Sequence, residues 1–589
     1  MANLDDTAKN ETPLTYTSEK SNIHAVKDQT QETADIPRGY WRSSIFLGSL
    51  AAIGMGLLSA IGGFGLLAPI LGIVNQDIGP SKNLSWLSIV YTMAIAVGLT
   101  VVGRFTDIFG RRHTFIGGAV LGVVGSIVSS RANSIETLIG GMLLIGLAAS
   151  TQVSYFYVTA ELVPRKYRFI GVAGTYGLAA PATSISPVIA YACVAHTSAG
   201  WRTVFYILIG CNSVALLCWV LFYRPPTFEM KHRGQQKIEY AKKFDYLGLL
   251  LFVGGLVVFL IGIEWGGNLY SWSSARVICT IVVGGPALIV FVVWELYARL
   301  AEPLVPITLL ADTGWTAAVV ISGLAASVYY GFSVVWPNMV SIMFTTGDLV
   351  KDGALASILG IAWVCGSLTA GTTTTVLKHV KLQLIVTFLL GGIFLGSMAT
   401  SNPDSRTRSC ILLAFANFCF GWAEGQSLVS TTLALPNQQE MGTGCGFGGS
   451  VRFAISTIAS VVYSTVLSHR LAVTIPDHVT PAVLKAGLPQ SSVAEFLTNL
   501  VSGLPLKNVP GIDTSIILAG ANAYEYACSD AYRTIFFVAI AFCGVGVIAA
   551  FSLPNLDALM TNDVETSLHH RNGDQESKVH ERAVVVRTP

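Results

Sequence analysis

Long apolar runs alternate with short polar segments through most of the chain. A helix needs about 20 apolar residues to cross the hydrocarbon layer of a bilayer. The runs of that length predict an all-α membrane protein with about fourteen transmembrane helices. They lie at residues 45–73, 84–104, 114–131, 136–158, 169–194, 202–223, 246–264, 277–297, 315–336, 353–376, 382–400, 408–433, 446–467 and 532–553.

Polar segments divide these runs into groups. Both ends of the chain are polar and charged, as is typical of disordered tails, and a basic segment after residue 223 predicts a linker between bundles. Residues 468–531 contain five prolines and predict a long outer loop with short helices, which serves as a lid or a folded elaboration. The expected parts are a tail at 1–44, a six-helix bundle at 45–223, a cytoplasmic linker at 224–245, two central helices at 246–297, a second six-helix bundle at 315–553 and a tail at 554–589.

Lys and Arg predict the orientation, because positively charged loops are retained in the cytoplasm during insertion. When the N-terminus is placed inside, most basic residues of the early loops fall on the cytoplasmic side and few fall outside, so both termini are predicted to be cytoplasmic. This topology puts the Asn83, Leu84, Ser85 sequon outside. Asn83 either accepts a glycan or lies too close to the second helix to be modified.

Composition excludes several classes of function. The chain is 52% hydrophobic and 12% charged, with a formal net charge of +2, which argues against a soluble globule and against nucleic acid as a partner. Its ten cysteines form no zinc-binding spacing, so we predict no metal site and no disulfide framework. The sequence has no motif for ATP binding or hydrolytic catalysis. We therefore expect no enzyme activity and no cofactor, and an ion gradient as the driving force.

The sharpest motif lies between the second and third predicted helices. Gly103 permits close helix contact, Gly110 turns the chain, and Asp107 can face Arg111, Arg112 and the N-terminus of a neighbouring helix. This pattern resembles the signature of the major facilitator superfamily, which implies a charged conformational latch between two bundles. A generic basic loop is the alternative interpretation.

Two further segments resemble this superfamily. Gly177, Pro181, Ser186 and Pro187 in the fifth predicted helix are similar to the antiporter motif, which implies an exporter. The central helices are bordered by residues 244–248, 264–267 and 302–306, and these resemble the fungal trichothecene efflux pump family, close relatives of siderophore-iron transporters. The resemblance implies proton-coupled export of a trichothecene or a similar hydrophobic secondary metabolite.

Charged residues inside a membrane are candidates for function because their burial costs several kcal/mol unless they are paired or hydrated. Glu424 and Arg452 lie at comparable depths of the twelfth and thirteenth predicted helices, so they can form a pair. Protonation of Glu424 would break that pair and change the access state. A purely structural ion pair is the alternative.

Polar and aromatic residues in the fourth, ninth and twelfth predicted helices predict a largely apolar substrate cavity, although packing between helices would explain them as well. The candidates are Gln152, Tyr155, Tyr157, Tyr329, Tyr330, Trp336, Asn417, Trp422 and Gln426.

These inferences combine into a transporter of two six-helix bundles plus two central helices, the fold of the major facilitator superfamily. The bundles rock around one cavity at the midplane of the bilayer. We expect a monomer in the plasma membrane, with a small hydrophobic organic substrate and protons as partners. A siderophore-iron importer of the same fold and a nutrient sensor built on a transporter scaffold are the rival functions.

Overall fold

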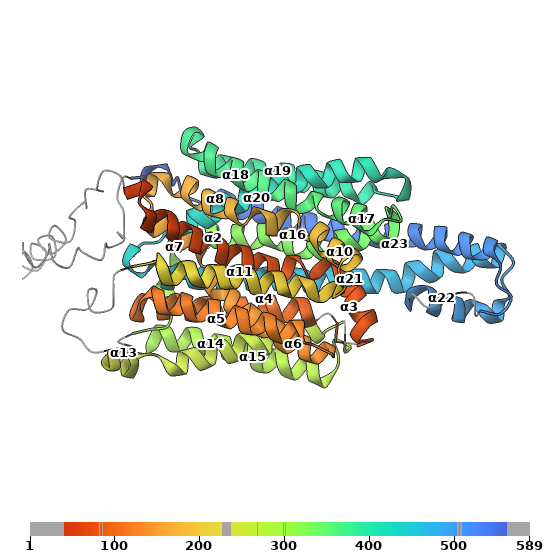
Figure 1. The fold of residues 1–589 in the computed structure, drawn as a ribbon, viewed down its shortest axis with the longest axis horizontal. Helices are drawn as coiled ribbons and strands as arrows, with labels where there is room; N and C mark the ends of the chain where they lie inside the picture. Colours follow the sequence, from red (N-terminus) through yellow and green to blue (C-terminus); the bar gives the residue numbers. More distant parts are fainter. Residues whose placement is uncertain are drawn as a thin grey trace, which may run out of the picture. The chain divides into compact units, whose positions relative to one another are not determined.

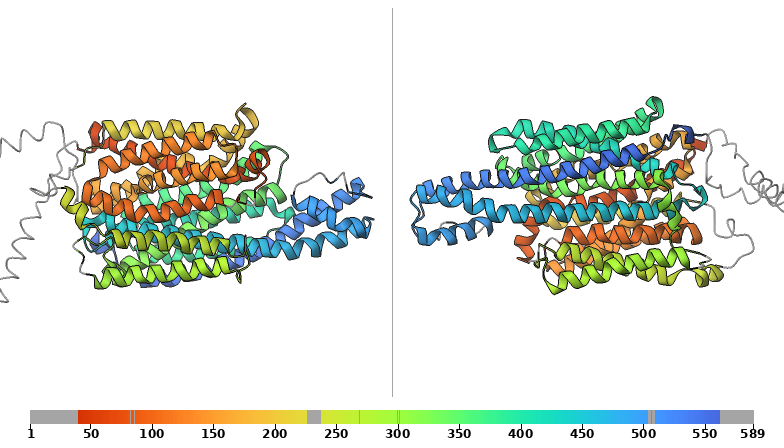
Figure 2. Two further views of the ribbon diagram at one scale, coloured as in Figure 1. Left: turned by 90° about the horizontal axis from the view of Figure 1, so that it is seen from below. Right: turned by 180° about the vertical axis from the view of Figure 1, so that it is seen from behind.

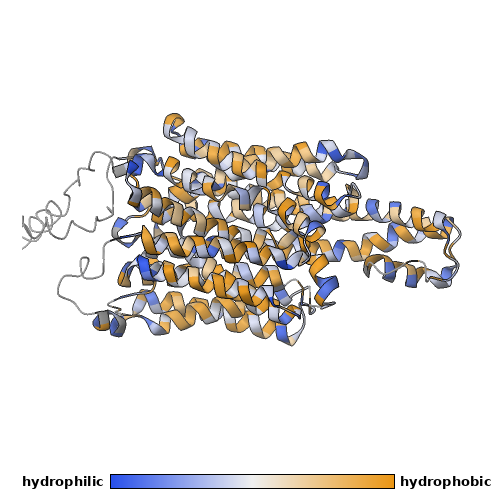
Figure 3. Ribbon diagram, viewed as in Figure 1, coloured by the Kyte–Doolittle hydropathy of each residue, from blue (hydrophilic) through white to orange (hydrophobic). Residues whose placement is uncertain are grey.

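The structure is a computed structural model that describes residues 40–225 except 82 and 85, 237–502 except 268, 299 and 301, residue 506 and residues 509–561. Most of the two predicted tails and half of the linker at 224–245 lie outside the described residues. The described part is helical, with two isolated β-bridges and no named strand. Hydrophobic residues follow the lengths of the helices and hydrophilic residues gather near their ends (Figure 3).

We group the helices in chain order into a first bundle, a central pair and a second bundle (Figure 1). The first bundle contains α2 (Ser44–Gly65), α3 (Leu71–Ile78), α4 (Trp86–Phe109), α5 (Arg111–Ser130), α6 (Ile135–Gln152), α7 (Tyr155–Leu162), α8 (Arg168–Leu178), α9 (Ala180–Ser184), α10 (Ser186–His196) and α11 (Thr203–Leu221). The short α13 (Lys237–Lys243) precedes the central pair, α14 (Tyr246–Trp265) and α15 (Ala275–Tyr297). The second bundle contains α16 (Thr313–Met343), α17 (Leu349–Ala356), α18 (Ile358–Leu377), α19 (Val380–Ser397), α20 (Arg406–Leu433), α21 (Met441–Lys485), α22 (Val493–Ser502) and α23 (Thr514–Ser552).

Two seams join the bundles. Along the first seam α4 packs against α21, and the central helix α14 contacts both of them. Along the second seam α8, α9 and α10 pack against α17 and α18. The cavities described below lie between the bundles.

Twelve helical stretches in the described residues are long and apolar enough to cross a membrane, so the chain is a multi-pass membrane protein. Two of the fourteen predicted spans are absent from this set. Residues 169–194 form α8, α9 and α10 in succession, and residues 408–433 form the more polar α20. The count of fourteen remains a prediction.

Prolines explain the interruption of the fifth predicted span. Pro181 lies in the first turn of α9 and Pro187 in the first turn of α10. Proline is accepted there because the first turn of a helix does not use that N–H group, whereas the ring prevents continuation from the preceding turn. One predicted helix therefore becomes three short ones.

The segment predicted as a long loop at 468–531 is mostly helical. At 1.5 Å per residue, the 45 residues of α21 extend about 68 Å, more than twice the roughly 30 Å of hydrocarbon. The ends of α21 and α23, together with α22, project from the bundles as a helical hairpin (Figures 1 and 2). Its core contains Ile475, Val479, Val483, Leu488, Val493, Phe496, Val509, Ile516 and Ala527.

This segment is helical and not a loop because its core residues have helical spacing. Ile475, Val479 and Val483 recur every four residues and present one apolar face. Pro476 and Pro481 suggested a break, yet both lie within α21. We call the end of the bundles with this projection the hairpin end, and the opposite end, with the turn at residues 109–111, the α4–α5 end.

Candidate functional site between the two bundles

A central cavity is walled by both bundles and is nearly filled in this conformation. Its walls leave about 420 Å³ unoccupied by atoms, but only about 30 Å³ is wide enough for the centre of a water-sized sphere. A buried water needs about 10–15 Å³ of such space, so the cavity has room for about two waters. The wall consists of Leu57, Ile61, Val153, Tyr155, Phe156, Tyr176, Tyr329, Tyr330, Trp363, Glu424, Leu428 and Arg452.

Aromatic rings from both bundles meet in this wall. Tyr330 of α16 packs edge-on against Phe64 of α2, with ring centroids 5.3 Å apart. Tyr329 contacts Trp363 with centroids 5.0 Å apart. In the first bundle, the ring centroids of Tyr155 and Tyr176 lie 6.0 Å apart. Such rings give a large apolar surface with a few hydroxyl groups, a lining suited to an apolar organic molecule that carries some oxygen atoms.

Glu424 of α20 and Arg452 of α21 form an ion pair in the same wall. Their side chains are 8% and 9% exposed, respectively, so both charges are largely removed from water. The guanidinium of Arg452 also lies 4.6 Å from the centroid of the Phe453 ring. Its Nη2 donates to Glu424, whereas its Nε has no hydrogen-bond partner among the described residues. The cavity therefore contains a proton-accepting carboxylate beside a permanent cation.

The other cavity candidates divide into two sets. Tyr155, Tyr329 and Tyr330 line the cavity. The remaining six are absent from its wall and bond elsewhere. Gln152 donates to Asn212, Tyr157 to Ser154, Trp336 to the Leu355 carbonyl, Asn417 to the Leu413 carbonyl, Trp422 to Gln383, and Gln426 to Thr374 and Gln383.

Sequence reasoning did not single out several wall residues. Phe156, Tyr176 and Trp363 line the cavity with Leu57, Ile61, Val153 and Leu428. An apolar or aromatic residue in a membrane helix carries no sequence signal that separates a cavity wall from lipid-facing packing. Among these residues, only Phe156 is adjacent in sequence to a predicted residue that lines the cavity, Tyr155.

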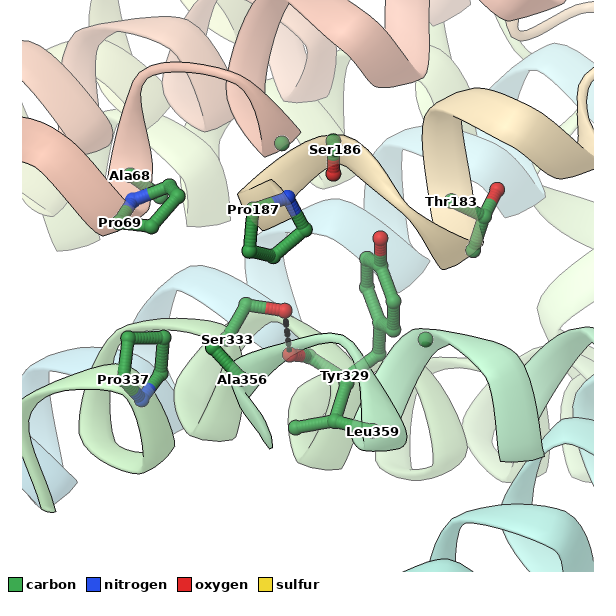
Figure 4. A pocket seen from close by; sticks show the side chains of 12 residues that line it. Ala68, Pro69, Thr183, Ser186, Pro187, Tyr329, Ser333, Pro337, Ala356 and Leu359 are labelled. Atoms are coloured by element: carbon green, nitrogen blue, oxygen red, sulfur yellow. Dashed lines mark hydrogen bonds between the residues drawn. The ribbon is translucent and has the colours of Figure 1, made fainter. Parts of the chain in front are cut away.

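A second, smaller space lies between the bundles around the start of α10 (Figure 4). Ser186 and Pro187 of the antiporter-like segment face Tyr329 and Leu359 across it. Pro181 and Gly177 are not among its wall residues. Because Tyr329 borders both spaces, its side chain stands between the central cavity and the second one.

Asp107 connects α4 to the N-terminus of α21. Its Oδ2 accepts hydrogen bonds from the Thr443 backbone N–H at 2.6 Å and from the Thr443 hydroxyl at 2.9 Å. Its Oδ1 lies 3.2 Å from Nη2 of Arg111, which also pairs with Glu161 of α7. A carboxylate is favoured at a helix N-terminus, where unpaired N–H groups and the helix dipole attract negative charge.

The remaining signature residues lie around this contact. Gly103 packs on α21 so closely that an added Cβ would lie 2.1 Å from the Gly442 carbonyl oxygen. Gly110 has a φ of +93°, a conformation that favours glycine. Arg112 instead donates to the Val220 carbonyl at 2.8 Å, within the first bundle.

Two more arginines join the bundles at this end, and sequence reasoning did not identify their partners. Arg104 pairs with Glu302 at 2.5 Å, after the central helices, and lies 3.6 Å from Glu440, just before α21. Arg168 donates to the Gln438 side chain at 3.1 Å. These partners are separated from the arginines by 198 or more residues, so no local spacing could have matched them.

The sequon residue Asn83 is half-buried in the turn between α3 and α4. Its backbone N–H donates to the Ser81 hydroxyl at 3.2 Å. Ser85, the last residue of the sequon, lies outside the described residues.

Comparison with known proteins identifies the family. The family model described as "Fungal trichothecene efflux pump (TRI12)" matches residues 9–583. The chain belongs to this family. Curated relatives agree with that membership. The trichothecene efflux pump TRI12 of Fusarium sporotrichioides is 27% identical over 555 residues, which cover 93% of this chain and 92% of that protein.

Two further relatives show the same relationship. The trichothecene efflux pump TRI12 of Trichoderma arundinaceum is 25% identical and covers 92% of both chains. The MFS-type transporter prx5 of Penicillium rubens is 28% identical over 74% of this chain and 80% of its own length. The fold is thus the all-α membrane fold of the major facilitator superfamily, and the family is one of transporters.

Proposed function

We propose that the chain exports a trichothecene mycotoxin or a similar hydrophobic secondary metabolite in exchange for protons. The observation that carries this proposal is the central cavity, where aromatic rings of both bundles surround one buried ion pair, Glu424 and Arg452. Family membership supports the class of substrate. The chain acts as a transporter without a chemical step.

Transport requires the bundles to separate, because the cavity as it stands admits about two waters and no polycyclic molecule. Rocking would open it alternately at the α4–α5 end and at the hairpin end. The latch at the α4–α5 end is formed by Gly103, Asp107, Gly110 and Arg111, with Arg112 bracing α5 against α11.

Glu424 is the proposed proton carrier. When it is ionised, it neutralises Arg452, and when it is protonated, the attraction between the two side chains weakens. That change alters the packing of α20 against α21 inside the cavity wall and thereby favours one access state. The pair thus links protonation to the position of the bundles.

Oligomeric state, membrane and orientation complete the proposed function. We propose a monomer in the plasma membrane, with both termini and the α4–α5 end in the cytoplasm and the helical hairpin outside. Asn83 then lies on the outer side, where a glycan could be attached. We also propose the division into two six-helix bundles and a central pair.

Retention of a radiolabelled trichothecene, measured in cells with and without the gene, tests the export function. Cells that carry the gene should retain several-fold less toxin, and collapse of the proton gradient should remove the difference. Equal retention would refute export. Uptake of an iron-loaded siderophore, measured in the same two strains, distinguishes the importer, because only that function predicts gene-dependent iron uptake.

Substitution Glu424→Gln tests proton coupling. The amide keeps the shape of the side chain but cannot release a proton, so efflux should lose its dependence on the proton gradient. Glu495→Gln, on the exposed surface of α22, is the matched control and should behave as the original protein. Retained proton dependence in Glu424→Gln would refute this role.

A further inference from the structure

The unpaired Nε of Arg452 is the feature of the cavity that the proposed proton exchange leaves unused. Arg452 is 8% exposed and lines the central cavity. Its Nη2 is engaged by Glu424, but Nε has no partner among the described residues. A buried donor on a charged group that stays unpaired is destabilising, so the site favours an occupant with an acceptor.

The surrounding charges restrict that occupant. A cationic substrate group would be repelled by the permanent charge of Arg452, and an anionic group would be repelled by the carboxylate of Glu424. The rest of the wall is apolar or aromatic apart from tyrosine hydroxyls. A neutral oxygen can accept from Nε without adding charge to this desolvated region.

We infer that Arg452 Nε recognises a neutral acceptor oxygen, such as a ketone, ester or epoxide, on an otherwise apolar, ring-containing substrate. This inference deepens the proposed function and rests on it for the direction of transport. In the closed conformation the roughly 30 Å³ of open space holds water at most. The substrate oxygen takes the place of that water when the bundles part.

The proposal also explains how substrate recognition stays compatible with the ion pair. Nη2 and Nε are separate donors of one planar guanidinium, so an acceptor at Nε leaves the contact with Glu424 intact. Neutral oxygen at this position does not add a negative charge that would favour protonation of Glu424. Binding and proton exchange therefore use different atoms of one side chain.

A matched series of tricyclic probes tests this recognition. Xanthone and xanthene differ in one carbonyl group, and 9-xanthenecarboxylate and protonated 9-aminoxanthene add a charge at the same carbon. Binding of each is measured by equilibrium dialysis with the purified full-length chain in lipid nanodiscs. Xanthone should bind at least about tenfold more tightly than the other three, because one hydrogen bond to a charged donor corresponds to about that factor.

Arg452→Lys tests whether Nε is the donor. Lysine keeps the positive charge beside Glu424, but its N–H donors share one nitrogen and none lies at the position of Nε. The preference for xanthone over xanthene should fall below about threefold, with xanthene binding unchanged. Arg408→Lys, an exposed position on α20, is the control and should keep the full preference.

Each outcome decides the inference. Equal binding of xanthone and xanthene by the original protein, or binding of neither, would overturn it, because the carbonyl oxygen would then make no contribution to binding. This comparison needs no variant, so a folding defect in Arg452→Lys does not remove the test. A xanthone preference in a protein that leaves trichothecene retention unchanged would uphold the site and refute the export function.

Discussion

The two ends of the interface between the bundles are closed by different interactions. At the α4–α5 end, Asp107 bonds to the N-terminus of α21, and Arg104 and Arg168 reach acidic or amide groups of other segments. At the hairpin end, Gly360 of α18 packs against the Thr183 carbonyl, and Gly353 of α17 packs near Pro187 and Val188. The described residues show no ion pair across this second contact.

This difference indicates how each end can be opened. Charged contacts respond to protonation, to salt and to removal of a single charge. Contacts between glycine and backbone atoms respond chiefly to added volume, because no free space accommodates a side chain. The α4–α5 end is therefore sensitive to removal of charge as well as to added volume, whereas the hairpin end is sensitive to added volume alone.

The largest effect is expected from Gly360→Ala. The new Cβ would lie 1.9 Å from the Thr183 carbonyl oxygen, so the hairpin end cannot close. The closed population should fall by about a hundredfold. Spin labels at Ser198 and Leu349, in a cysteine-free background, should report a longer distance by pulsed electron paramagnetic resonance. Gly174→Ala, whose Cβ meets nothing within 4 Å, should leave that distance unchanged.

Gly103→Ala applies the same test to the opposite end. Its Cβ would lie 2.1 Å from the Gly442 carbonyl oxygen, but Gly442 and Gly446 have no side chains, so α21 can slide further than α9. The population of the closed state at the α4–α5 end should fall about thirtyfold. Labels at His113 and Lys378 measure it, and Gly117→Ala is the control because its Cβ would meet open space. Lengthening at the hairpin end instead would contradict the separation of the two closures.

Asp107→Asn removes charge without adding volume. The amide keeps one acceptor for Thr443 but loses the ionic component of its bond to the helix N-terminus and to Arg111. The closed state at the α4–α5 end should be destabilised by about 1–2 kcal/mol, which lowers its population nearly tenfold. The His113–Lys378 distance should lengthen and the Ser198–Leu349 distance should not. Asp77→Asn, which breaks a pair with Arg202 inside the first bundle, serves as the control.

Glu440→Gln should have the smallest effect. Glu440 is 43% exposed and lies 3.6 Å from Arg104, whose closer partner is Glu302. A second, longer ion pair whose carboxylate is this exposed contributes about 0.5 kcal/mol or less, about twofold in population, and salt screens it. The His113–Lys378 distance distribution should therefore change slightly at low salt and not at 0.5 M salt. An equal change at both salt concentrations would show that the contribution is not ionic.

The membrane fold was predictable because hydrophobicity over about 20 residues directly reflects the thickness of the bilayer. The helical hairpin was not, because Pro476 and Pro481 suggested breaks that α21 tolerates. Comparable depth predicted that Glu424 and Arg452 could meet, since the two helices are consecutive and antiparallel. The same comparison of depths could not predict the pairing of Arg104 with Glu302, because these residues do not lie on consecutive helices.

Polarity alone was a weaker guide to the cavity. Asn417, Trp422 and Gln426 bond within the second bundle, since a polar group in an apolar helix usually bonds to a neighbouring helix or to its own backbone. Conversely, apolar Leu57 and Leu428 line the cavity. The direction of each side chain depends on helix rotation, which a single sequence does not specify.

The central pair covers only one of the two seams. Because α14 contacts both α4 and α21, it covers the first seam between the bundles. At the second seam, Ile170, Leu178 and Ile361 remain 43%, 47% and 44% exposed, respectively. One flank of the interface is thus shielded by an extra pair of helices, whereas on the other flank apolar side chains of α8 and α18 form the outer surface.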